Sequence, residues 1–283
     1  MVLTIASFEI RQRLRRISTY VYFVVFFALS VFFVCMAGGV ISGAAVDFST
    51  GGKIWLNSPY ALNVITMYIA FLGIVVTGAI AGQATYQDTD NHISDLFYTA
   101  PITKFDYLGG RFLGALVVQI LIFSSVGFGA YVGMRLPWLD QTRLGPNNAL
   151  AYLQPYLILV LPNLVLNSAI FFGLAASWRK MLPVYVGSVL LLIGYFTAAQ
   201  LSTNLSVNTV TALADPFGAT AVDRLTQYWS PFQRNTQLIP LSGVLLLNRV
   251  LWLGLGGIIL AITYARFSLL SSTARQETSR CYG

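Results

Sequence analysis

The chain has 283 residues, of which 56% are hydrophobic and only 10% are charged, and its mean hydropathy is +0.70. Soluble domains carry about 25% charged residues, so this composition excludes an ordinary soluble protein and predicts a polytopic membrane protein. The net charge of +7 lies mostly in short segments beside apolar runs, which favours a role in membrane orientation over nucleic-acid binding. Cys35 and Cys281 are far apart and belong to no metal-binding or C-x-x-C pattern.

The first 18 residues are predicted to form an amphipathic helix. Its apolar positions at helical spacing are Leu3, Ile10, Leu14 and Ile17, and its basic residues are Arg11, Arg13, Arg15 and Arg16. Such a helix lies in the membrane interface, with its apolar face in lipid and its basic face toward the headgroups. The alternative interpretation is a basic flank that only orients the first span.

Six apolar segments follow, each close to the roughly 20 residues that cross the hydrocarbon core. They are residues 20–40, 61–82, 112–134, 156–177, 183–201 and 244–265. Pro162 is expected to bend the fourth segment. Six spans place both termini on one side of the membrane. The 17 Lys and Arg residues divide eleven to six in favour of that side, which predicts cytoplasmic termini.

The predicted fold class is therefore an all-α membrane protein with an N-terminal interfacial amphipathic helix and six transmembrane helices. Its parts are the interfacial helix (1–18), the six-span domain (19–270) and a polar cytoplasmic tail (271–283).

Several kinds of catalytic site are excluded by motif. One histidine cannot make an H-E-x-x-H zinc site, and no G-x-S-x-G elbow is present. A P-loop needs Gly-Lys-Ser or Gly-Lys-Thr, but the three lysines are followed by Ile54, Phe105 and Met181. We therefore expect no catalytic, cofactor or metal site in this chain, and we do not expect it to be an enzyme.

The apolar segments contain no Asp or Glu at mid-membrane depth. Proton- or sodium-coupled transporters often carry such carboxylates, so a secondary transporter is the weaker hypothesis. The mid-span polar residues are Asn63, Thr66, Thr77, Gln119, Asn163, Asn167 and Gln200. They either hydrogen-bond between helices, which is the more common role of such groups, or line a translocation path.

A hydrophilic island, residues 87–106, separates the second and third apolar segments and holds four carboxylates and His92. An EF-hand loop that began at Asp88 would need Gly at Ile93 and Glu at Thr99, so the acidic cluster does not match a calcium site. The remaining interpretations are a solvated loop or a short helix on the surface.

A short helix in the island would be capped by Asp90 or Asn91. Ile93, Leu96 and Phe97 would then form one apolar face at i, i+3 and i+4. Because an apolar face on a polar loop requires a partner, this helix predicts a soluble subunit that docks there.

Two stretches carry a family resemblance. The first reads Asp95-Leu96-Phe97-Tyr98-Thr99-Ala100-Pro101-Ile102-Thr103-Lys104, then Tyr107-Leu108-Gly109 and Arg111-Phe112-Leu113-Gly114. The second reads Asp215-Pro216-Phe217-Gly218, Thr226, Tyr228-Trp229, Arg234-Asn235-Thr236, Pro240-Leu241-Ser242-Gly243 and Asn248-Arg249 with Trp252. With the interfacial helix and six spans, these stretches resemble the ABC type-2 exporter permeases. The likeness is to the N-terminal permease half of the subfamily whose longer members carry a gluzincin-type aminopeptidase domain.

The resemblance covers nearly the whole chain and implies the transmembrane permease subunit of an ATP-driven ABC exporter. The expected location is the plasma (cytoplasmic) membrane, as a multi-pass protein of the bacterial inner membrane. Expected partners are ABC ATPase subunits, a second permease half in a homo- or heterodimer, and membrane lipids, but no nucleic acid. ATP and Mg²⁺ would be bound by the ATPase and not by this chain. No peptidase residues are present, so the chain is expected to be a half-size permease, a split version or a truncated half.

The resemblance also implies roles for particular residues. In this family the loop between spans two and three, here 86–110, carries the helix that couples to the ATPase. The coupling residues would be Ile93, Asp95, Leu96, Phe97 and Tyr98.

The outer segment, residues 202–243, is expected to contain re-entrant or interfacial helices. It is interpreted either as a gate or lid or as a surface cap held by aromatic residues. Its candidate residues are Asp215, Pro216, Phe217, Gly218, Tyr228, Trp229, Arg234 and Asn235. A non-transporting membrane anchor or assembly factor for a partner enzyme is the alternative function.

Overall fold

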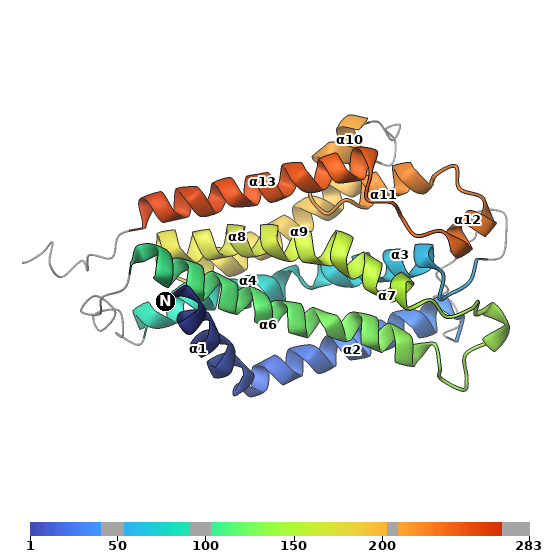
Figure 1. The fold of residues 1–283 in the computed structure, drawn as a ribbon, viewed down its shortest axis with the longest axis horizontal. Helices are drawn as coiled ribbons and strands as arrows, with labels where there is room; N and C mark the ends of the chain where they lie inside the picture. Colours follow the sequence, from blue (N-terminus) through green and yellow to red (C-terminus); the bar gives the residue numbers. More distant parts are fainter. Residues whose placement is uncertain (41–53, 91–102, 203–208, 268–283) are drawn as a thin grey trace, which may run out of the picture.

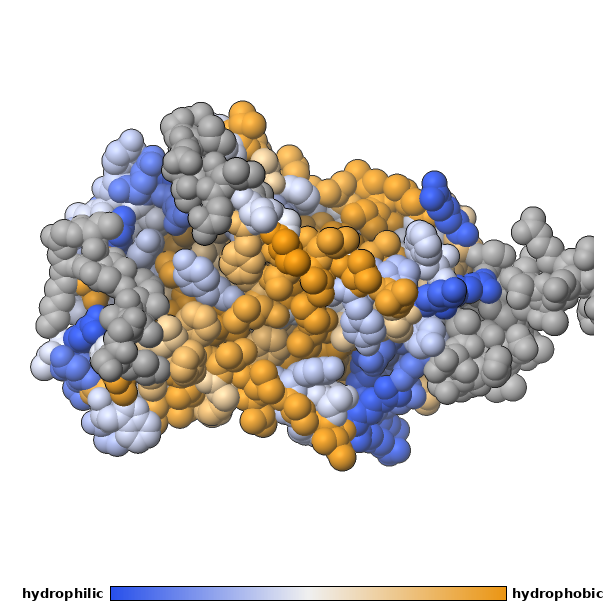
Figure 2. All heavy atoms as spheres, turned by 180° about the vertical axis from the view of Figure 1, so that it is seen from behind, coloured by the Kyte–Doolittle hydropathy of each residue, from blue (hydrophilic) through white to orange (hydrophobic). Residues whose placement is uncertain are grey.

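The computed structural model describes residues 1–40, 54–90, 103–202 and 209–267. All regular structure in this part of the chain is helical, and the helices form an elongated bundle (Figure 1). Apolar residues gather around the middle of the bundle and hydrophilic residues toward its two ends (Figure 2). This distribution is typical of a protein whose middle lies in lipid and whose ends lie in water.

Four helical segments are long and apolar enough to cross a membrane. They are α2 (Ile17–Ala37), α6 (Lys104–Gly133), the run Ala149–Trp178 and α13 (Gly243–Arg266). The pair α3 (Pro59–Leu72) and α4 (Ile74–Asp90) makes a fifth span if the two helices count as one. Helix α9 (Leu182–Ser202) is apolar too, and its fully described part, Leu182–Thr197, is shorter than the length required here of a span. The all-α class is confirmed for the described residues, and six spans stay a prediction.

The segment 61–82 is not one straight helix, because α3 and α4 meet at Gly73 with a bend of 51°. Phe123 of α6 packs into this bend. A Cβ added at Gly73 would lie only 2.2 Å from Phe123 Cζ, so a larger residue there requires the Phe123 ring to move. Hydropathy does not reveal such a break, because both halves are equally apolar.

The run Ala149–Trp178 also contains an irregular turn. It consists of α7 (Ala149–Pro155), a π-helical turn η2 (Tyr156–Val160) and α8 (Leu161–Trp178). Pro162 stands in the first turn of α8 and has no N–H to bond the carbonyl one turn earlier, so the ladder is interrupted there. The irregularity beside Pro162 is therefore a π-helical turn, and Ala149–Trp178 still counts as one span; the bend expected at Pro162 stays a prediction.

Helices α4 and α6 both extend into the hydrophilic island. Helix α4 continues to Asp90, and α6 begins at Lys104 rather than at 112. A capping box starts α6: the Thr103 hydroxyl accepts the Asp106 N–H at 3.1 Å, and the Asp106 carboxylate accepts the Thr103 N–H at 3.2 Å. The predicted coupling residues Ile93, Asp95, Leu96, Phe97 and Tyr98 lie outside the described residues.

The two ends of the bundle differ in content. One end, here called the α1 end, carries α1 (Val2–Leu14), the start of α6, the junction of α8 with α9 and the end of α13 (Figure 1). The opposite end carries α7 and three short helices that we call the cap. The cap consists of α10 (Thr209–Ala214), α11 (Ala219–Thr226) and α12 (Pro231–Thr236).

Candidate functional site

At the α1 end, helix α1 packs directly on the first half of α6. Gly110 and Gly114 of α6 form a small-x-x-x-small stripe that lets the two backbones approach closely. A Cβ at Gly114 would lie 2.6 Å from Glu9 Cβ, and one at Gly110 would lie 2.6 Å from Ile5 Cβ. The two glycines therefore allow the backbones of α1 and α6 to pack closely.

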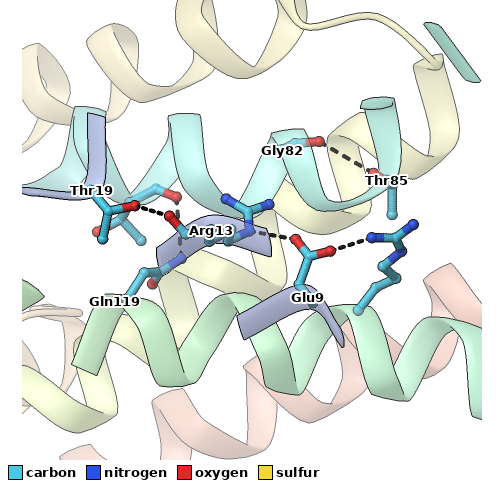
Figure 3. Close-up of polar contacts among 8 residues, drawn as sticks. Glu9, Arg13, Thr19, Gly82, Thr85 and Gln119 are labelled. Carbon is cyan, nitrogen blue, oxygen red and sulfur yellow. Dashed lines mark hydrogen bonds and ion pairs between the residues drawn. The ribbon is translucent and has the colours of Figure 1, made fainter. Parts of the chain in front are cut away.

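This packing buries a cluster of three charged side chains, here called the charge cluster: Glu9, Arg13 and Arg111. Glu9 is 0% exposed and forms an ion pair through each of its carboxylate oxygens. One oxygen accepts from Arg13 one turn later in α1, and the other accepts from Arg111 of α6. Figure 3 shows the Glu9 carboxylate between two guanidinium groups, of which Arg13 is labelled. One carboxylate therefore links α1 to α6 and orders the end of α1.

The charge cluster is also tied to α2. Thr19 of α2 donates its hydroxyl hydrogen to the Arg13 carbonyl at 2.7 Å (Figure 3). Burial lowers the pKa of the Arg13 guanidinium, and the neighbouring Glu9 carboxylate opposes that shift. The arginines remain charged at neutral pH, so the cluster carries one net positive charge. Three helices therefore meet at a buried charged site in which one carboxylate is the counter-ion of two guanidinium groups.

The inward position of Arg13 differs from the expectation that the N-terminal arginines face the lipid headgroups. Arg13 is buried against α6, whereas Arg11 and Arg15 are exposed. The reason is Glu9, which shares the inward face of α1 with Arg13 at i, i+4 spacing. The apolar residues Leu3 and Leu14 lie to the side of that face, where they can contact lipid.

At the opposite end, the segment Asp215–Gly218 forms a tight turn between α10 and α11. The Asp215 carboxylate accepts the Phe217 N–H at 2.9 Å and the Thr220 N–H at 2.7 Å, which caps the start of α11. Gly218 has φ 79°, a left-handed conformation that favours glycine. The carboxylate and the glycine together fix the shape of this turn.

Helix α13 holds the turn in place through two consecutive polar residues. Asn248 donates to the Ala212 carbonyl at 2.7 Å and to the Asp215 carbonyl at 2.8 Å. Arg249 donates to the Pro216 carbonyl at 3.2 Å and to Asn163 Oδ1 of α8 at 3.0 Å. Trp252 of the same helix donates its ring N–H to the Leu213 carbonyl at 3.0 Å. The buried Arg249 side chain thus connects α13 to α8 and to the cap through hydrogen bonds. We call this network the Arg249 clamp.

The clamp holds Phe217 inside the bundle. This side chain is 2% exposed and packs against two rings from other helices. Its ring centroid lies 4.6 Å from that of Phe71 in α3 and 4.8 Å from that of Tyr195 in α9. Phe71 and Tyr195 also contact each other, at 4.3 Å between centroids, so Phe217 completes a cluster of three rings that joins the cap to α3 and α9.

The other candidate residues of the cap lie apart from this turn. Arg234 of α12 stacks over the Tyr60 ring at 4.7 Å and donates to the Thr226 carbonyl at 3.2 Å. Asn235 accepts the Trp55 N–H at 2.8 Å, so α12 is bound to the segment before α3. Trp229 packs partly against the cap's apolar core. Tyr228 is 90% exposed and takes part in neither group.

The mid-span polar residues differ in their contacts, and Thr77 bonds only the Gly73 carbonyl of the preceding turn with its hydroxyl, at 3.0 Å. Gln119 of α6 accepts from the Ser168 hydroxyl of α8 at 2.7 Å, and Asn163 joins the Arg249 clamp. Asn63 donates to Pro59 within its own helix at 2.8 Å. Thr66 lines a mostly apolar cavity of about 260 Å³, which Tyr152 and Tyr156 of the α7–η2 run also line. Asn167 is buried in α8, and the side chain of Gln200 lies outside the described residues.

Reasoning from the sequence missed Glu9, and it named Arg111 only as part of a stretch that carries the family resemblance, without a contact to another helix. Two local signals were present: the i, i+4 spacing of Glu9 and Arg13, and the Gly110-x-x-x-Gly114 pattern around Arg111. Neither signal indicates that α1 contacts α6, because 102 positions separate Glu9 from Arg111.

Among the described residues, no group of three His, Cys, Asp or Glu side chains is arranged to hold a metal ion. The charged residues of both sites are bound to one another, to asparagine side chains or to backbone N–H and carbonyl groups, so each site attaches one part of the bundle to another. Comparison with protein-family models and with curated proteins finds no match for this chain.

Proposed function

We propose that this chain is the transmembrane permease subunit of an ATP-driven ABC exporter. The observation that carries the proposal is the attachment of α1 to α6 by the charge cluster at one end of the bundle. The segment that links α4 to α6, which holds the coupling residues suggested by the sequence, is continuous with the same α6. An ATPase that docked against this segment and α1 would move α1 and α6 together, because the charge cluster attaches the two helices.

In this proposal the ATPase engages Ile93, Leu96, Phe97 and Tyr98, and its closure moves the start of α6. Two contacts of α6 support transmission of this movement to the other spans. Phe123 packs at the bend between α3 and α4, and Gln119 accepts a hydrogen bond from Ser168 of α8. At the far end, the Arg249 clamp and Phe217 act as the gate. Six spans, cytoplasmic termini, a bacterial inner-membrane location and a second permease half belong to the same proposal.

A secondary transporter is disfavoured by the placement of acidic groups. In the described residues the buried carboxylates are Glu9 and Asp215, which lie in α1 and in the cap rather than within a span. Ion-coupled transport usually requires such a group within the membrane, where an ion is bound or relayed.

Copurification tests the proposed function. The chain is tagged at its C-terminus, extracted from its native membrane in mild detergent and isolated, and the associated proteins are identified by mass spectrometry. The proposal predicts a soluble subunit with a Walker A motif. The double variant Leu96→Ala/Phe97→Ala is expected to reduce its recovery, whereas Ser94→Ala in the same segment is the matched control.

Equal recovery of the ATPase with the double variant and the control would refute the coupling assignment. Stable isolation of the wild-type chain with a partner enzyme but without any ATPase would instead support the membrane-anchor alternative. Elution of each variant at the wild-type volume in size-exclusion chromatography excludes misfolding as the cause.

A further inference from the structure

A polar pocket opens at the α1 end between the last turns of α8 and α13. Its volume is about 300 Å³, and the described residues that line it are Ala176, Ser177, Arg179, Thr263, Arg266 and Phe267. The two helices can meet here because Gly173 has no side chain: a Cβ at Gly173 would lie 2.7 Å from Thr263 Oγ1. The pocket is therefore formed where two closely packed helices end.

The pocket lies at the depth of lipid headgroups. Trp178, at the end of α8, is 64% exposed, and Tyr264, in the last turn of α13, is 45% exposed. Trp and Tyr with exposed rings concentrate at the membrane–water boundary. Within the two turns before Tyr264, α13 presents the exposed apolar side chains of Ile258 and Ile262, along which an acyl chain can lie.

The charged side chains in the described lining of the pocket are positive. Arg179 and Arg266 are the charged residues among its described lining, and a guanidinium binds phosphate oxygens through paired N–H groups. Lys104 lies near the same end, with its ammonium 4.7 Å from the centre of the Tyr264 ring. The adjoining carbonyls at the two helix ends repel an anion, so binding depends on the arginines.

We infer that this pocket binds the phosphate headgroup of an anionic phospholipid. Basic pockets between membrane helices bind such headgroups when they lie at the interface, which is the arrangement described above. The Ser177 hydroxyl supplies a further donor at the rim, and the lipid tails would follow α13. The inference requires only that the bundle lies in a bilayer, so it is independent of whether the chain transports anything.

The test uses the full-length protein and defined lipids. The wild-type chain is placed in nanodiscs of phosphatidylcholine, with and without phosphatidylglycerol, and amide hydrogen exchange is measured. We expect slower exchange of residues 176–179 and 263–267 when phosphatidylglycerol is present. A third sample contains phosphatidylcholine and inorganic phosphate, and it is expected to resemble phosphatidylcholine alone.

Glutamine variants test which arginines bind the headgroup. Native mass spectrometry of Arg179→Gln and of Arg266→Gln is expected to show phosphatidylglycerol binding weakened roughly fivefold for each arginine. Arg135→Gln removes the same charge from an exposed arginine at the cap end and is expected to bind as the wild type does.

Three results would overturn the inference. The first is equal protection in both lipid compositions. The second is unchanged phosphatidylglycerol binding by both glutamine variants. The third is full protection by inorganic phosphate without anionic lipid, which would make this a site for soluble phosphate. The exchange measurement uses only the wild-type chain, so it remains decisive if a variant does not fold.

Discussion

Glu9 and Arg111 are separated by 102 positions in the chain, yet they form a buried ion pair that attaches α1 to α6. A buried carboxylate that faces two guanidiniums is costly to remove, because both cations are then left in a poorly solvated site. The pair therefore makes α1 a fixed part of the bundle rather than a helix that floats on the membrane surface.

Glu9→Gln keeps the shape of the side chain and removes its charge. We expect this change to destabilise the protein by about 3 kcal/mol, because Arg13 and Arg111 lose their common counter-ion. The measurement is the midpoint of thermal unfolding in detergent. Arg11→Gln, on the exposed face of the same helix, is the control and is expected to unfold near the wild-type temperature. A Glu9→Gln midpoint equal to that of the control would show that the ion pairs do not hold α1.

Gly114→Ala tests the close packing of α1 on α6. The new Cβ would lie 2.6 Å from Glu9 Cβ, so α1 must shift, and we expect a loss of about 1–3 kcal/mol. Gly254→Ala in α13 is the matched control, since a Cβ there meets no atom within 4 Å. Thermal unfolding of the two variants should differ, with the control at or above the wild-type midpoint. Equal stability of both variants would contradict the observed contact.

Arg249→Lys tests the clamp at the cap. Lysine keeps the positive charge but cannot reach Asn163 and the Pro216 carbonyl together, so we expect a local loss of about 2 kcal/mol. Amide exchange in residues 212–220 should accelerate, while α1 exchanges as before. Arg135→Lys, an exposed arginine at the same end, should leave both regions unchanged. Faster exchange throughout the chain would mean that Arg249 stabilises the whole bundle rather than the cap.

The topology is tested by labelling single cysteines in a chain whose Cys35 and Cys281 are replaced by alanine. A cysteine at Ser94 should react with a membrane-impermeant maleimide only after the cells are opened, because we expect that segment to be cytoplasmic. A cysteine at Gln141, exposed at the opposite end, should react in intact cells. The reverse pattern of labelling would invert the proposed orientation.

Hydropathy predicts the long helices well because it depends on local composition. Helix α2 covers 17–37 where an apolar run at 20–40 is visible, and α13 covers 243–266 where the run is 244–265. The start of α6 at Lys104 was missed, because polar residues such as Asp106 can occupy a helix without lowering its stability when they cap it. Composition therefore predicts which segments lie in lipid, but not how far each helix extends into water.

The contacts between distant segments could not be predicted in the same way. Gly73 is one of 24 glycines, and nothing beside it in the sequence shows that Phe123 fills the bend. The outer motif at Asp215–Gly218 was visible as a group of residues, but its attachment to Asn163 through Arg249 depends on the packing of α8 against α13. Such relationships follow from tertiary packing, which one sequence does not encode locally.

The most direct test of the central claim is ATP hydrolysis by the assembly isolated from the native membrane and reconstituted in lipid. The account predicts vanadate-sensitive hydrolysis by the wild-type preparation and its loss from the Leu96→Ala/Phe97→Ala preparation, with Ser94→Ala retaining the activity. Equal hydrolysis by the double variant and the Ser94→Ala preparation, or no hydrolysis in any of the preparations, would contradict it.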